Sequence, residues 1–176
     1  MKEQINNAHI WNAAARTGLV FGLFSGICLA AKQLAAASGM PASTSTILGI
    51  ALWGLEFFGC IALMAFFMKK LSRDFDEVTR RDTFRYGRRI ALLSGLILAA
   101  VQLLLVTTVG RETFETTMEE AMQAYTPMLD ANASNALEEM LDMLPVFAFF
   151  GQWLWCWIYG TILSSILSRF IPAEEW

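Results

Sequence analysis

A single carboxylate, Glu56, interrupts an apolar run that extends from Thr46 to Met68. Because a helix rises about 1.5 Å per residue, Glu56 would lie about 15 Å below the nearer end of a helical span. A carboxylate at that depth in a bilayer must face the interior of a bundle, take up a proton or find a partner. Glu56 is therefore the residue of this chain best suited to bind a proton or a ligand.

Three further polar residues interrupt the other apolar runs, in the same half of the bilayer as Glu56. They are Lys32, Gln102 and Gln152. We expect the four side chains to form one intramembrane polar layer, in which Lys32 reaches toward Glu56. Two interpretations stay open: a proton or ligand site of a small transporter or sensor, and a polar clamp that fixes helix packing.

Gly18, Gly22 and Gly26 follow one another at intervals of four residues in the first apolar run. Small residues at this spacing lie on one face of a helix and allow another helix backbone to approach closely. The partner is either another helix of the same bundle or a second copy of the chain. The spacing predicts a helix-packing seam without identifying that partner.

No catalytic set accompanies these residues. His9 is the one histidine and lies in the polar start of the chain, which disfavours an intramembrane protease. The sequence has neither a nucleophile elbow nor a glycine-rich phosphate loop. Cys28, Cys60 and Cys156 lie in three different apolar runs and form no CxxC pair. We predict no catalytic residue, no metal site and no cofactor.

Four apolar segments must position the polar layer. The chain has 176 residues, of which 56% are hydrophobic and 16% charged, and its mean hydropathy is +0.46. Soluble domains contain about 25% charged residues, so this composition favours a membrane protein. We predict one membrane domain over residues 1–176, with spans at about 14–37, 46–68, 89–110 and 145–168.

Basic residues gather between the second and third spans. The stretch from Lys69 to Arg89 contains eight of the thirteen Lys and Arg residues, and we assign 69–88 to a loop. Short basic loops beside membrane spans stay in the cytoplasm, so both termini are expected there too. The basic cluster is short and contains acids, which argues against nucleic acid as a partner.

The segment 111–144 is acidic, with eight acids against the single Arg111. Its apolar residues recur at helical spacing, which predicts two amphipathic helices on the outer face. The expected fold class is therefore an all-α integral membrane protein. We expect a four-transmembrane-helix bundle with a short amphipathic helical periplasmic cap.

Several stretches together resemble a known family. A glycine-rich first span follows a short start that contains Trp11, and the segment Asp82-Thr83-Phe84-Arg85-Tyr86-Gly87 leads into the third span. The fourth span ends in Ile162-Leu163-Ser164-Ser165-Ile166-Leu167. This arrangement resembles the DUF4199 family, small four-span proteins of Bacteroidetes-type bacteria whose function is unknown. The resemblance implies a multi-pass protein of the bacterial inner membrane and supplies no catalytic residues.

The glycine seam, the aromatic fourth span and the lack of a catalytic set favour a non-enzymatic protein. We expect an accessory or scaffold subunit that acts through helix or lipid contacts. Its expected partners are the lipid bilayer and either a second copy or another membrane protein. The alternative function is a small transporter or sensor that uses Glu56.

Overall fold

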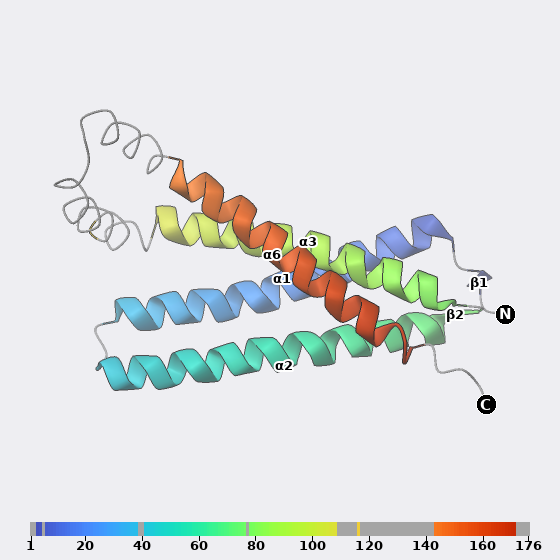
Figure 1. The fold of residues 1–176 in the computed structure, drawn as a ribbon, viewed down its shortest axis with the longest axis horizontal. Coiled ribbons are helices and arrows are strands. Elements are labelled where there is room, and N and C mark those ends of the chain that lie inside the picture. The colour runs from blue at the N-terminus through green and yellow to red at the C-terminus, as the bar shows by residue number, and fades with distance from the viewer. Residues whose placement is uncertain are drawn as a thin grey trace.

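The computed structural model of the chain describes residues 3–4, 6–38, 41–76, 78–108, 116 and 143–171. Its long helices are α1 (Asn7–Ala37), α2 (Ala42–Asp74), α3 (Arg80–Thr107) and α6 (Leu144–Leu167). All four are long and apolar enough to cross a membrane. The predicted fold class is confirmed: the protein is an all-α, four-helix bundle of multi-pass membrane type (Figure 1).

Two helices continue into the basic stretch between the second and third spans. α2 extends to Asp74 and α3 begins at Arg80, so most of the segment 69–88 is helical. We predicted a loop there from the sequence. Lys and Arg are good helix formers, and hydropathy alone marks the edge of the membrane rather than the end of a helix. A capping box starts α3: Asp82 N donates to Thr79 Oγ1 at 3.3 Å, and Thr79 N donates to Asp82 Oδ2 at 3.2 Å.

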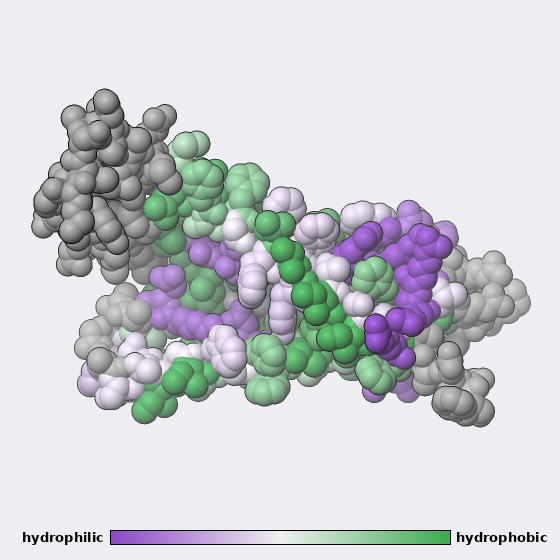
Figure 2. Space-filling model, in the orientation of Figure 1, coloured by the Kyte–Doolittle hydropathy of each residue, from purple (hydrophilic) through white to green (hydrophobic). Residues whose placement is uncertain are grey.

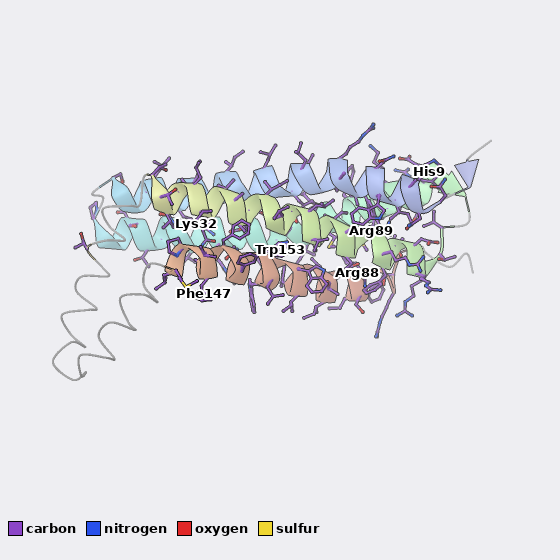
Figure 3. All side chains as sticks on the ribbon, turned by 90° about the horizontal axis from the view of Figure 1, so that it is seen from above. His9, Lys32, Arg88, Arg89, Phe147 and Trp153 are labelled. Atoms are coloured by element: carbon purple, nitrogen blue, oxygen red, sulfur yellow. The ribbon has the colours of Figure 1, made fainter. Side chains whose placement is uncertain are left out.

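The two ends of the described chain meet at the basic end of the bundle. The short strands β1 (Glu3–Gln4) and β2 (Phe75–Asp76) pair in parallel and join the N-terminus to the α2–α3 connection. The Thr83 hydroxyl donates to the carbonyl oxygen of Ile171 at 3.0 Å, which joins the end of α6 to α3. Arg88 and Arg89 lie toward this end and Lys32 toward the other (Figure 3).

The hydrophobic core lies in the basic half of the molecule. Its largest fully buried side chains include Met64 and Met68 of α2 and Ile90 of α3. α3 packs closely against both α1 and α6, whereas α2 packs mainly against α1. Away from the core the helices separate into two arms, α1 with α2 and α3 with α6 (Figure 1). The bundle is thus closed at the basic end and open toward the other.

Hydrophilic residues are distributed unevenly over the surface of the bundle. Hydrophilic atoms gather over the basic end, and a smaller hydrophilic area lies partway toward the other end, between the two arms (Figure 2). The predicted periplasmic cap over 111–144 lies outside the described residues, apart from Thr116, Met143 and Leu144.

Candidate functional site: an intramembrane cavity

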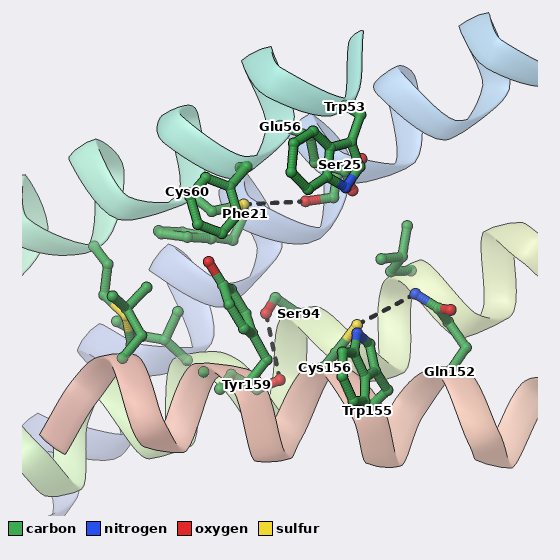
Figure 4. Close-up of a pocket in the computed structure, with 18 residues that line it drawn as sticks. Phe21, Ser25, Trp53, Glu56, Cys60, Ser94, Gln152, Trp155, Cys156 and Tyr159 are labelled. Atoms are coloured by element: carbon green, nitrogen blue, oxygen red, sulfur yellow. Dashed lines mark hydrogen bonds between the residues drawn. The ribbon is translucent and has the colours of Figure 1, made fainter. Parts of the chain in front are cut away.

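A cavity of about 390 Å³ lies in the middle of the bundle, between α2 and α6, and residues of all four helices line it (Figure 4). Its volume falls in the range of small-molecule sites, about 300–1,000 Å³. Phe21 and Met64 form a buried floor, with 5% and 2% of their surfaces exposed. Trp53 of α2 and Trp155 of α6 flank the opening and are 61% and 65% exposed.

Glu56 lies in the wall of this cavity. Its Oε2 accepts a hydrogen bond of 2.5 Å from Lys32 Nζ, so the two side chains also form an ion pair between α2 and α1. Both side chains are about three-quarters buried, with 23% and 25% of their surfaces exposed. A charge in the hydrocarbon region is costly unless it is paired, and Lys32 supplies the opposite charge.

The two glutamines of the expected polar layer lie in different places. Gln152 lines the cavity from α6, where its amide Nε2 donates to Cys156 Sγ at 3.4 Å. Gln102 is half-buried on α3 and is not among the residues that line the cavity. The structure therefore brings Glu56 together with Lys32 and places Gln152 in the same cavity, but it does not place Gln102 there.

Aromatic rings connect the two sides of the opening. The Trp53 and Phe57 rings stack with centroids 5.5 Å apart and an interplanar angle of 17°. The Phe57 ring also lies near the ring of Tyr159 on α6, with centroids 6.1 Å apart. We call Trp53, Phe57 and Tyr159 the aromatic row.

Small polar side chains that the sequence pattern does not mark as site residues also line the cavity. Ser25 Oγ and Cys60 Sγ lie 3.7 Å apart, and Ser94 faces the cavity from α3. Cysteine and serine are common fillers of apolar helices, so nothing in their spacing marks them. Ser25 and Cys60 lie near the middle of the first and second spans, as Glu56 does, and this position is the available signal. Ser94 lies five residues after the start of the third span, so depth does not mark it.

The glycine seam packs within the chain, against α3. A Cβ atom added at Gly18 would lie 2.9 Å from Leu93 Cβ, and one added at Gly22 would lie 2.6 Å from Ile97 Cβ. One added at Gly26 would lie 3.3 Å from Val101 Cγ2. Only glycine permits so close a crossing of α1 and α3. Of the two partners considered for this seam, the structure places a helix of the same chain against it.

A second set of close contacts joins α3 to α6. Ser164 Oγ donates to the carbonyl of Phe84 at 2.9 Å, and Trp153 Nε1 donates to the carbonyl of Leu92 at 3.1 Å. Gly160 approaches Ala91 so closely that any side chain at this glycine would collide with it. These contacts fix the rotation of α6, and with it the direction in which Gln152 and Tyr159 face the cavity.

The lining of the cavity offers groups for non-covalent binding. The cavity combines apolar walls with one carboxylate, an amide and a few hydroxyl and thiol groups, which is the usual composition of a site for a small amphipathic molecule. Among the described residues, no group of three or more His, Cys, Asp or Glu side chains could hold a metal ion. His9 lies toward the opposite, basic end (Figure 3), so no imidazole is near Ser25 or Ser94 to act as a base.

Comparison with known proteins agrees with the family resemblance. No protein of curated function and no solved structure is significantly similar to the chain. The model of a family of proteins of unknown function, DUF4199, matches residues 17–171, which include all the residues that line the cavity. The chain therefore belongs to the DUF4199 family.

Proposed function

We propose that this protein is a non-enzymatic accessory subunit of the bacterial inner membrane that binds one amphipathic molecule from the bilayer. The binding site is the cavity between α2 and α6. The observation that carries the proposal is an opening flanked by exposed tryptophans, Trp53 and Trp155, above a wall that contains the Glu56 carboxylate. Such a site offers apolar contact to a chain or ring and a polar contact to a head group.

The depth of the cavity supports this proposal. Glu56 follows Ile47 by nine residues and precedes Met68 by twelve, which correspond to about 14 and about 18 Å of helix. The cavity is therefore near the middle of the apolar part of α2. An occupant can enter sideways from the hydrocarbon, because α2 makes little contact with α6. Both helices also expose large apolar side chains along their outer faces, including Phe58 and Ile162.

The orientation that we propose places the basic end in the cytoplasm. β1, the α2–α3 connection and the end of α6 lie together at the end that carries Arg88 and Arg89, which supports an N-in, C-in arrangement. Reporter fusions at the C-terminus and in the turn between α1 and α2 test it. At the C-terminus, only a reporter that is active in the cytoplasm should give a signal. In the turn between α1 and α2, only a reporter that is active in the periplasm should do so. The reverse pattern would overturn the orientation.

The binding function is tested by filling the cavity. Ser94 lines it, and among the described residues its hydroxyl donates to the carbonyl of Ala91, within α3. Ser94→Phe therefore fills part of the cavity and removes no hydrogen bond between described helices. Ala100, on the exposed side of the same helix, provides the matched control Ala100→Phe. The protein is purified in lipid nanodiscs, and the small molecules extracted from it are quantified by mass spectrometry.

We expect wild type and Ala100→Phe to retain the same hydrophobic molecule in a fixed ratio to protein, and Ser94→Phe to lose at least about nine-tenths of it. If Ser94→Phe does not fold, the smaller change Ser94→Leu takes its place and should lose an intermediate amount of the bound molecule. Equal retention in all variants would overturn the proposal. A chemically converted product recovered only from wild type would overturn its non-enzymatic part.

One observation favours a second function, a small transporter or sensor that uses Glu56. The carboxylate lines the cavity while it pairs with Lys32, so an occupant and Lys32 can compete for it. Flux of the bound molecule across proteoliposomes tests this function. A flux that Glu56→Gln abolishes while binding persists would favour transport, and binding without any flux would favour the accessory role.

A further inference from the structure

We propose that the molecule held in this cavity is a lipophilic cation. Its charged centre would lie against the Glu56 carboxylate and its apolar groups against the aromatic row. This inference rests on the proposed binding function and specifies the class of ligand.

The sign of the charge in the cavity favours a cation. Among the described residues that line the cavity, Glu56 is the one charged side chain. Lys32, which neutralises it, lies on α1 and is not part of the lining. An occupant of the cavity thus meets the carboxylate directly and the ammonium only beyond it. In a medium of low dielectric constant, this order attracts a cation and repels an anion.

The Glu56 carboxylate has capacity left for a second partner. Among the described residues, Lys32 is the hydrogen-bond donor to this carboxylate, and it donates to Oε2. A carboxylate has about four lone-pair positions and accepts from two partners readily. A cation in the cavity can therefore share Glu56 with Lys32 from the other side, and the two cations compete for it.

The aromatic row also favours a cation. A cation over the face of Trp, Tyr or Phe is attracted by the negative face of the ring, and tryptophan is the strongest of the three. Trp53 stacks on Phe57, and Phe57 leads to Tyr159, so aromatic rings extend from one side of the opening to the other. Trp155 is a further exposed indole at the same opening. Together with one carboxylate, these rings distinguish a site for organic cations from a general apolar groove.

Two ions of nearly equal size and shape but opposite charge, tetraphenylphosphonium and tetraphenylborate, test the inference. Binding of each is measured by equilibrium dialysis against the full chain in zwitterionic nanodiscs, with empty nanodiscs subtracted. We expect Glu56→Gln to weaken binding of the phosphonium at least about tenfold and to leave or strengthen binding of the borate. Lys32→Gln should have the opposite effect on the phosphonium and tighten its binding, because the competitor is removed.

The aromatic contribution is tested with Trp53→Leu, which keeps an apolar side chain at the opening. It should weaken binding of the phosphonium severalfold more than binding of the borate, since cation–π attraction acts on the cation alone. Glu56→Asp keeps the charge and should keep the preference for the cation. If Glu56→Gln does not fold, Glu56→Asp is compared with Lys32→Gln in its place.

The outcomes separate this inference from the proposed function. If Ser94→Phe abolishes binding of both ions but Glu56→Gln changes neither, the cavity binds amphipathic molecules and the preference for cations is wrong. If Ser94→Phe also leaves both ions bound, the proposed function fails as well. Tighter binding of the phosphonium by Glu56→Gln would overturn the inference directly.

Discussion

The contact between α1 and α3 and the contact between α2 and α6 differ in how they are made. α1 crosses α3 along Gly18, Gly22 and Gly26, with no room for a side chain at the first two. α2 and α6 lie on opposite sides of a cavity and make few contacts with each other. In α2, Gly49 and Gly54 have open space where a side chain would be. Close packing joins the helices of one region, and a cavity separates the helices of the other.

The comparison shows how α2 is attached to the bundle. At the basic end its methionines are buried in the core, and nearer Ala42 the ion pair between Glu56 and Lys32 joins it to α1. In a bilayer, apolar surface gains little from leaving lipid, so helices are joined by close packing and by polar links. At the glycine seam α1 and α3 are joined by the first means, and at Glu56 α1 and α2 are joined by the second.

The largest effect is expected from breaking the ion pair. Glu56→Leu leaves the Lys32 ammonium unpaired near the middle of the bilayer and should lower the free energy of unfolding by about 3 kcal/mol. The double variant Lys32→Met with Glu56→Leu removes both charges and should recover most of this loss. Unfolding is followed by tryptophan fluorescence in mixed micelles. If the double variant is as unstable as the single one, packing and not the ion pair holds this part of α2.

A smaller effect is expected from a methyl group in the glycine seam. Gly22→Ala places a carbon 2.6 Å from Ile97 Cβ and should lower the free energy of unfolding by about 2 kcal/mol, as overpacking does. The matched variant Gly54→Ala meets no atom within 4 Å. It should be neutral or gain up to about 1 kcal/mol from helix propensity. Equal effects in the same unfolding assay would mean that α1 and α3 are not as tightly packed as described.

The smallest effect is expected at the opening of the cavity. Trp155→Phe alters an indole that is 65% exposed and should change the free energy of unfolding by less than about 0.5 kcal/mol. Trp153→Phe, two residues earlier on the same helix, removes the hydrogen bond to Leu92 and should cost about 1 kcal/mol. A loss at Trp155 as large as that at Trp153 would show that the opening is packed rather than free for a ligand.

Much of the fold could be predicted from the sequence because its signals are local. Long apolar runs predict helices of membrane-spanning length, and the structure has four of them. The basic stretch was harder to interpret, because charge marks the boundary between membrane and water but does not stop a helix. The start of α3 within this stretch is capped by Thr79 and Asp82, which the hydropathy profile does not register.

The candidate site was predicted less completely. Glu56 and Lys32 were found because a charge in an apolar span is conspicuous, and Gln152 was grouped with them by depth. Gln102 was grouped in the same way, but depth says nothing about which way a side chain faces around its helix. Ser25, Ser94 and Cys60 were not found, since residues of these types are ordinary in apolar helices and only their shared cavity makes them notable.

The sequence by itself determined the class of the protein, the glycine face of the first span and the presence of one acid deep in the second, because each follows from the order of residues along one segment. The tertiary structure decided which helix meets the glycine face, that Lys32 pairs with Glu56, and that a cavity separates α2 from α6. These depend on how each helix is rotated and where it crosses its neighbours. Contacts between distant segments, such as those of Gly160 with Ala91 and of Trp153 with Leu92, set that rotation.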